Sequence, residues 1–183
     1  MQEPTKQSSA RIRVVPATRE QEPVLANLLE LYIYDFSEIL PVALGQDGRF
    51  GYKGLSDYWS LPDHHPFLIT VDDQLAGFVL VKKSLALCDH ANGNDKQIWD
   101  IAECFVVRAH RCSGVGLIAA HQVWCQFPGP WQVRVMDINP AAKPFWQRAI
   151  DTFAGHQIDP APINHGGKTW AVFTFESRAA GQV

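Results

Sequence analysis

The stretch from Ile98 to Gly116, IWDIAECFVVRAHRCSGVG, constrains the fold more than any other part of the chain. An apolar run is followed by a short basic segment. Two glycines, Gly114 and Gly116, then precede an apolar helical pattern that continues to Phe127. This order predicts a strand, a tight turn and a helix whose first turn is rich in glycine. Glycine lets a ligand approach the backbone closely, and the free N–H groups of a first helical turn bind phosphate. We therefore expect a phosphate-binding turn, to which Arg111 adds a charged hydrogen bond.

Length and composition agree with a single folded domain. The 183 residues are 46% hydrophobic and 19% charged, which is typical of a globular chain rather than a disordered one. A net charge of −3 argues against a duplex nucleic-acid binder, which needs a basic face. No apolar run approaches the ~20 residues of a membrane span, and the first ten residues lack the apolar core of a secretory signal. The four cysteines and seven histidines show no metal-ligand spacing, so we expect reduced thiols, no metal and a cytoplasmic location.

The rest of the chain alternates strand and helix patterns. Residues 1–10 are expected to be disordered, 11–176 to form one domain, and 177–183 to form a loose tail. Between Ser37 and Pro66 lies a long segment rich in glycine, proline and aromatic residues, and such segments often line binding sites. Helices are expected at about 18–36, 55–59, 114–127 and 139–150. Strands are expected at 11–15, 67–71, 75–83, 98–107, 131–136, 155–159 and 168–175, which together indicate an α/β fold.

The glycine turn fits two kinds of phosphate binder. The spacing Gly114-x-Gly116-x-x-Ala119 satisfies the dinucleotide-binding pattern, and Asp137 ends the next predicted strand where a ribose ligand is expected. This interpretation predicts an NAD(P)-dependent oxidoreductase. Against it, six residues separate the end of the strand from Gly114, whereas a dinucleotide-binding fold turns almost directly from the strand into its first glycine.

The second interpretation covers more of the chain. The pattern RxxGxG at 111–116, after a strand that ends in two valines, resembles the acyl-CoA pyrophosphate loop of the GNAT superfamily of N-acetyltransferases. The pattern NxxAxxFW at 139–146 resembles the following motif of that superfamily, and the order of elements matches along nearly the whole chain. The resemblance implies a mixed, mostly antiparallel sheet of six to seven strands, with a central splayed parallel pair and helices on both faces. It also implies transfer of an acetyl group from acetyl-CoA to a primary amine.

In the superfamily, the pantetheine arm of the coenzyme lies in the gap between the splayed strands like an extra strand. A backbone N–H near Val106 is then expected to polarise the thioester carbonyl, as an oxyanion hole does. Carried over by position, the resemblance implies coenzyme contacts from the central strand, the glycine loop and the following motif. The residues concerned are Cys104, Phe105, Val106, Arg111, Cys112, Ser113, Gly114, Val115, Gly116, Asn139, Phe145 and Trp146.

Two acids on the central strand are candidates for the base that removes a proton from the acceptor amine. Glu103 lies inside the apolar run AECFVV, where burial is expected to raise its pKa. Asp100 matches a position where other members of the superfamily carry their base. On a regular strand the two acids face opposite sides, but the superfamily often has a bulge here that shifts the faces. We rank Glu103 first; the alternative for each acid is a structural ion pair with an arginine or a loop cap.

Many members of the superfamily use a tyrosine on the motif helix to protonate the departing thiolate, where this chain has Phe145-Trp146. Either the thiolate leaves unprotonated, or Tyr52, Tyr58 or His65 of the long segment takes this role. The acceptor is expected to meet an aromatic and acidic pocket suited to a cationic amine. Its expected residues are Tyr32, Tyr34, Asp35, Glu38, Tyr58 and Trp59; the alternative places Tyr32 in the core and the two acids in solvent.

The sequence leaves the acceptor open among a small amine, an antibiotic, a peptide terminus and a lysine. The missing tyrosine also keeps a non-catalytic acyl-CoA-binding sensor as an alternative to an enzyme. Neither nucleic acid nor membrane is expected as a partner. Members of the superfamily often pair through their sheets, so the resemblance allows a homodimer.

Overall fold

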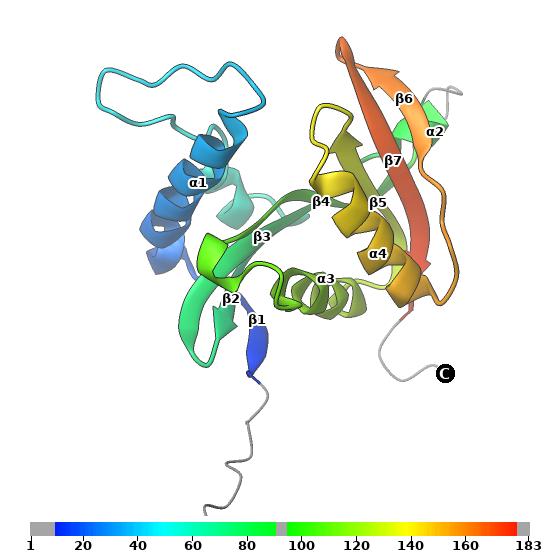
Figure 1. The fold of residues 1–183 in the computed structure, drawn as a ribbon, viewed down its shortest axis with the longest axis horizontal. Coiled ribbons are helices and arrows are strands. Elements are labelled where there is room, and N and C mark those ends of the chain that lie inside the picture. The colour runs from blue at the N-terminus through cyan, green and yellow to red at the C-terminus, as the bar shows by residue number, and fades with distance from the viewer. Residues whose placement is uncertain (1–9, 91–94, 179–183) are drawn as a thin grey trace, which may run out of the picture.

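The computed structural model describes residues 10–90 and 95–178, which fold around one seven-stranded sheet. Neighbouring strands are antiparallel except for a parallel pair, β4 and β5, at the centre (Figure 1). The spatial order is β1-β2-β3-β4-β5-β7-β6. The strands are β1 (Ile12–Pro16), β2 (His64–Val71), β3 (Gln74–Leu85), β4 (Gln97–Val106), β5 (Gly129–Met136), β6 (Ala161–His165) and β7 (Lys168–Ser177).

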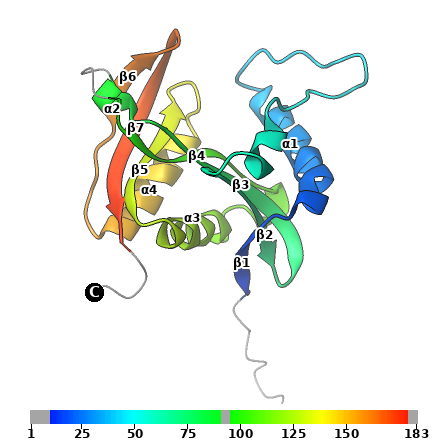
Figure 2. The same cartoon turned by 180° about the vertical axis from the view of Figure 1, so that it is seen from behind.

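Helices cover both faces of this sheet, as the fold prediction requires (Figures 1 and 2). One face packs against α1 and the short 3-10 helix η2, and the other packs against α3 and α4. Among the described helices, none combines the length and apolar character that crossing a bilayer demands. The helices are η1 (Arg19–Gln21), α1 (Glu22–Phe36), η2 (Leu55–Trp59), α2 (Leu87–His90), η3 (Arg108–His110), α3 (Val115–Gln126) and α4 (Ala142–Ala154).

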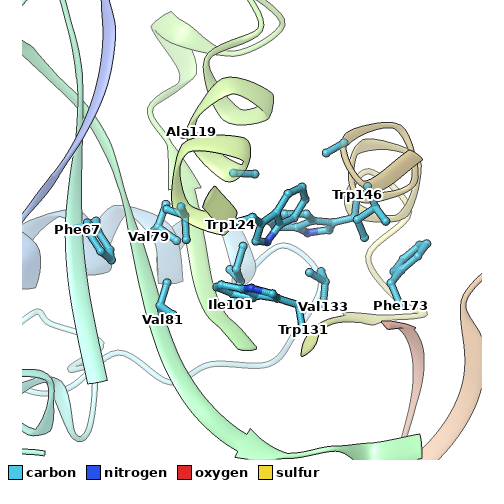
Figure 3. Close-up of a cluster of buried hydrophobic side chains, with 14 of the residues drawn as sticks. Phe67, Val79, Val81, Ile101, Ala119, Trp124, Trp131, Val133, Trp146 and Phe173 are labelled. Carbon is cyan, nitrogen blue, oxygen red and sulfur yellow. The ribbon is translucent and has the colours of Figure 1, made fainter. Parts of the chain in front are cut away.

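The larger part of the core lies between the sheet and the α3–α4 layer (Figure 3). Trp124 of α3, Trp131 of β5 and Phe173 of β7 are fully buried there. The rings of Trp124 and Trp146, from α3 and α4, lie with their centroids 6.2 Å apart. Large aromatic rings contribute much of the hydrophobic free energy of such a core, so this layer holds β4, β5 and α4 in fixed positions.

The central parallel pair is joined only at one end. Trp99 pairs with Trp131 and Asp100 pairs with Gln132, and beyond Asp100 the two strands have no further ladder pairs. On its other side β4 stays paired with β3 along its length. The predicted splay is therefore confirmed, and it leaves one side of the β4 backbone facing a gap. A doubly wound parallel sheet, which the dinucleotide interpretation requires, is not the architecture of the described residues.

Three local expectations are wrong. The strand expected at 155–159 lies at 161–165, because Gly155 takes a φ of 76° and ends α4. The last helix begins at Ala142, so Pro144 falls in its first turn, where a missing N–H costs no helical hydrogen bond. The short helix α2 lies between the strands expected at 75–83 and 98–107, where no helix is expected. Most of the expected disordered N-terminus and loose C-terminal tail lies outside the described residues.

Candidate active site

A cavity of about 420 Å³ lies in the gap between β4 and β5. Its walls come from the two splayed strands, from α1 and the segment after it, from α4, and from β7. Most of the lining is apolar. The lining side chains that carry polar groups or thiols are Tyr32, Tyr52, Glu103, Cys104, Arg134, Asn139, Trp146 and Trp170.

A bulge in β4 turns its two acids to the same face of the sheet. Glu103 pairs with Leu80 of β3 and Ile101 pairs with Val81, so Ala102 is an extra residue with no partner of its own. Leu80 belongs to the core under α1, whereas Ile101 belongs to the core under α3 and α4. The one-residue insertion therefore reverses the alternation of β4 and places Glu103 on the α1 face. The bulge that the resemblance implies is thus present.

Glu103 is held at the cavity wall by two tyrosines. The hydroxyl of Tyr32, on α1, donates a hydrogen bond to Oε2, and the hydroxyl of Tyr52 donates to Oε1 at 3.2 Å. Burial raises the pKa of Glu103 above its ordinary value of 4.5, against the opposing effect of these hydrogen bonds and of Arg134. Burial and the charge of Glu103 also raise the pKa of both phenols, so the tyrosines stay protonated donors. The direction predicted for the pKa of Glu103 is confirmed.

Asp100 also lies on the α1 face, but it is engaged in a different way. It is fully buried and does not line the cavity. Nη2 of Arg134, on β5, forms an ion pair with its Oδ2 at 2.6 Å, and the hydroxyl of Ser84 donates to the same oxygen at 2.8 Å. This is the structural ion pair with an arginine that the sequence left as an alternative. The geometry therefore favours Glu103 as the acid that can meet an acceptor.

The backbone of β4 presents unpaired groups to the gap at two of the three expected positions. Val107 donates its N–H to Ala76 of β3 at 2.9 Å. Because successive residues of a strand alternate, the backbone groups of Phe105 also face β3, and those of Cys104 and Val106 face the gap. The side chain of Phe105 is buried under α1. Of the three residues, Cys104 and the N–H of Val106 are therefore placed to bond an extended arm, whereas the carbonyl of Val106 accepts a hydrogen bond from Arg111.

The glycine loop, residues 111–116, places the first turn of α3 next to the end of β4 where β4 and β5 are no longer paired. Cys112 and Gly114 take left-handed conformations, with φ of 60° and 85°, which turn the chain from η3 into α3. Gly114 ends this turn with no side-chain cap. Within the described chain, no backbone carbonyl accepts from the amides of residues 115–117. Such a helix start is suited to an anion.

Close packing explains the second glycine of the loop. A Cβ on Gly116 would lie 3.1 Å from Cζ of Phe145 and 3.6 Å from Cγ2 of Val106. Phe145 thus packs on the loop, whereas its neighbour Trp146 lines the cavity. Asn139 also lines the cavity, and its Oδ1 accepts from the Ala142 N–H at 3.1 Å, which shapes the turn into α4.

The side chain of Arg111 ties the loop to α1. Its Nε donates to the carbonyl oxygen of Val106 at 2.7 Å, and its Nη2 bonds Asp35, which also accepts from Arg108 at 2.7 Å. Burial alone would raise the pKa of Asp35, but the hydrogen bonds from the two arginines outweigh it and lower that pKa. A phosphate contact from the Arg111 side chain would therefore compete with Asp35.

The residues expected around the acceptor are not brought into the cavity. Tyr34 points to solvent with 62% of its surface exposed, and Asp35 faces the arginines. The indole of Trp59 donates to the carbonyl of Ala17 at 2.9 Å, and Tyr58 of η2 is buried in the core beside α1. None of the five residues lines the cavity: Tyr34, Asp35, Glu38, Tyr58 and Trp59. Tyr32, which the sequence placed either here or in the core, does line it.

The acceptor side of the cavity contains Tyr52, which the sequence suggested only as a proton donor for the thiolate, and Arg134, which the sequence patterns did not single out. Tyr52 reaches the cavity because Glu30 of α1 accepts from the N–H groups of Phe50 at 2.7 Å and Gly51 at 3.0 Å. Arg134 was missed although it interrupts the apolar run VRVM at 133–136. A single cation inside such a run is unusual, and it could have marked Arg134 as a candidate functional residue. Within residues 10–90 and 95–178, no group of three His, Cys, Asp or Glu side chains is arranged to hold a metal.

Comparisons with known proteins agree with this geometry at the level of fold. No protein-family model and no curated protein matches the sequence. Solved structures do match. A protein of Desulfovibrio desulfuricans assigned to the GNAT family has a TM-score of 0.60 at 11% identity, over 92% of this chain and 100% of its own.

Two further matches were solved with ligands. NAA60 of Arabidopsis thaliana, with a bisubstrate analogue, has a TM-score of 0.60 at 15% identity, over 91% of this chain and 98% of its own. RimL, a ribosomal L7/L12 alpha-N-protein acetyltransferase solved with coenzyme A, has a TM-score of 0.62 at 11% identity, over 92% of this chain and 95% of its own. The seven-stranded sheet, its splayed centre and these matches together show that the chain has the fold of the GNAT acetyltransferases.

Proposed function

We propose that this protein transfers an acetyl group from acetyl-CoA to a primary amine, with Glu103 as the base. The observation that carries the proposal is the position of the cavity. The cavity joins a half-buried carboxylate of raised pKa to a splayed strand pair that ends at a helix start without a side-chain cap. Structural neighbours bind coenzyme A or acetyl-CoA, which supports the same use of this gap.

The residues present fit an acyl-CoA. The amides at the start of α3 would hold the pyrophosphate, since they lack backbone acceptors in the described chain. The gap-facing backbone groups of Cys104 and Val106 would bond the amide-bearing arm as a neighbouring strand would. Asn139 and Trp146 line the opposite wall. Coenzyme A bound in this way supplies the activated acetyl group.

The chemistry asked of this chain is the removal of one proton. An amine of pKa about 10 is mostly protonated at neutral pH, so it must lose a proton before it attacks. Glu103 takes that proton, directly or through a water molecule. The amine nitrogen then bonds the acetyl carbonyl carbon and releases its second proton to solvent, the carbon–sulfur bond breaks, and the sulfur leaves as a thiolate. A gap-facing N–H of β4, at Cys104 or Val106, would stabilise the charge that develops on the carbonyl oxygen.

Tyr52 is the best placed of the three candidates for returning a proton to the thiolate. It lines the cavity, whereas Tyr58 and His65 do not. Its hydroxyl also bonds Glu103, so a proton accepted by the carboxylate can replace one that the phenol gives up. The products are then the amide, the free thiol and the one proton that the nitrogen releases to solvent.

Ligand-dependent melting tests the proposal. A ligand at about 100 times its Kd adds about 2.7 kcal/mol of stability, which raises the Tm of a chain this size by about 5–10 °C. We expect this shift with acetyl-CoA and none with NAD or NADP. Thiol release over a panel of amines then separates an enzyme from a binding module. A shift with the dinucleotides alone, or tight coenzyme binding without turnover of any amine, would contradict the proposed reaction.

A further inference from the structure

Arg134 lies on the side of the cavity that an acceptor would enter. In the β5–β7 ladder, Arg134 is the partner of Val172, which is two residues from Trp170. The guanidinium of Arg134 forms its ion pair with Asp100 on the α1 face. The tyrosine-bound Glu103 is on that same face. The α4 face, with Trp146, belongs to the opposite wall. One face of the gap therefore holds a carboxylate and a guanidinium that both line the same cavity.

The hydrogen-bonding capacity of Arg134 is only partly used. Asp100 takes one amino group of the guanidinium, and Nε is buried without any partner in the described chain. Trp170 packs against the guanidinium, with Cζ 5.7 Å from the ring centroid, and limits where it can move. A buried donor left unpaired costs free energy, and an arginine fork is well shaped for a carboxylate. A bound carboxylate would use the capacity that Asp100 leaves free.

The surroundings of this pair are apolar. Phe36, Leu40 and Val42, from the end of α1 and the segment after it, line the cavity, and Met136 and Trp170 face them from β5 and β7. Charged groups other than Glu103 and Arg134 do not line the described cavity. A ligand that suits these walls carries one positive group, one negative group and an apolar body.

We propose that the acceptor is a free amino acid with an apolar side chain. Its ammonium group meets Glu103 and its carboxylate meets Arg134, while the side chain lies against the apolar residues of α1, β5 and β7. This inference rests on the proposed acetyl transfer and narrows its acceptor. The product is the N-acetyl amino acid: the ammonium group loses one proton to Glu103 and a second to solvent, the N–C bond forms, the carbon–sulfur bond of the thioester breaks, and coenzyme A leaves as the free thiol.

A substrate series tests the recognition of the carboxylate. Leucine is compared with 3-methylbutylamine, which has no carboxylate, and with leucinamide, in which an uncharged amide replaces the carboxylate. The two analogues bracket leucine in basicity, so a preference for leucine over both does not come from amine protonation. We expect kcat/KM for leucine to exceed both by about 10- to 100-fold, the range for a hydrogen bond between charged groups.

Variants then assign the preference to Arg134. Arg134→Lys keeps a charge beside Asp100 but loses the fork, and it should reduce the preference for leucine at least tenfold. Lys82→Gln is the matched control, because Lys82 also acts on Glu103 electrostatically but does not line the cavity. It should leave the preference unchanged. If Arg134→Lys fails to fold, the double variant Asp100→Asn, Arg134→Gln removes the pair together and serves the same purpose.

The outcomes separate the acceptor from the reaction. Equal or better use of the two analogues would overturn the amino acid acceptor and leave acetyl transfer standing. If acetyl-CoA shifts the Tm but neither leucine nor any other amine is turned over, the proposed reaction is contradicted and the amino acid acceptor falls with it. If acetyl-CoA itself gives no shift, the proposed function fails and the inference fails with it.

Discussion

Replacing Glu103 by glutamine removes the charge of the proposed base and keeps the shape of the side chain. The amide oxygen can accept from one of the two tyrosines, and the amide N–H can donate to the other hydroxyl, so Tyr32 and Tyr52 keep a partner. General base catalysis contributes about 10²–10⁴-fold. We therefore expect Glu103→Gln to lower kcat/KM by that factor, which corresponds to about 3–5 kcal/mol of activation free energy.

The same variant has a predicted effect on stability with the opposite sign. Because burial raises the pKa of Glu103, the folded state holds a proton between pH 4.5 and that raised pKa, where the unfolded chain has released it. The free energy of unfolding of the wild type therefore falls as the pH rises through this window. Glutamine does not titrate, so the variant should gain stability relative to the wild type as the pH rises and should not melt lower at neutral pH.

The measurement is a pH series of thiol release with a reagent that reports thiols in acid as well as base. The wild type should show a limb that rises with pH through the raised pKa of Glu103, and the variant should lack that limb. Asp100→Asn is the comparison, since it removes a buried acid on the same face that does not line the cavity. Asp100→Asn should lower the Tm, because it leaves Arg134 without its partner. Its rate of thiol release should still rise with pH as in the wild type. A Glu103→Gln enzyme with kcat/KM within threefold of the wild type would refute the reasoning.

Three further substitutions test other parts of the geometry. Tyr52→Phe removes one hydrogen bond to Glu103 and the proposed proton donor, so thiol release should slow at least tenfold while the Tm measured with acetyl-CoA still shifts; an unchanged kcat would exclude the donor role. Gly77→Ala would place a Cβ 2.1 Å from the carbonyl oxygen of Phe105 and push β3 from β4, so thermal melting should show a fall of about 2–12 °C; an unaltered Tm would contradict that register. Asp35→Asn breaks two ion pairs at the end of α1 and should cost about 1 kcal/mol in denaturant unfolding at neutral pH, with the loss vanishing as the pH falls toward the lowered pKa of Asp35. The acceptor KM should stay unchanged, because Asp35 lies outside the cavity.

Much of the fold could be predicted because its elements have strong local patterns. The capping box of Thr18 and Gln21 precedes α1, and the apolar run before the glycine loop defines the centre of the sheet. The first strand of the last hairpin was predicted too early because the sequence around Gly155 is compatible with both the start of a strand and the end of a helix. The positive φ of Gly155, which no sequence pattern reports, settles the matter.

The candidate site was predictable in part. The bulge at Ala102 came with the resemblance, and Glu103 was ranked first because an acid inside an apolar run is expected to have a raised pKa. The acceptor side was not predictable, because it depends on how the segment after α1 folds back. Glu30 holds Phe50 and Gly51 through backbone amides, and this contact between residues 20 and 21 positions apart carries Tyr52 to the cavity.

The extra residue in β4 also determines which acids can share one wall. Deleting Ala102 would make Ile101 and Glu103 consecutive residues opposite Val81 and Leu80, so both side chains would keep their present faces and only the bulge would be lost. If instead every residue of β4 paired one-to-one with β3, Asp100 and Glu103 would face opposite sides, and Arg134 could not meet both. The register of one strand, without any change in amino-acid type, therefore decides which acid faces the ligand.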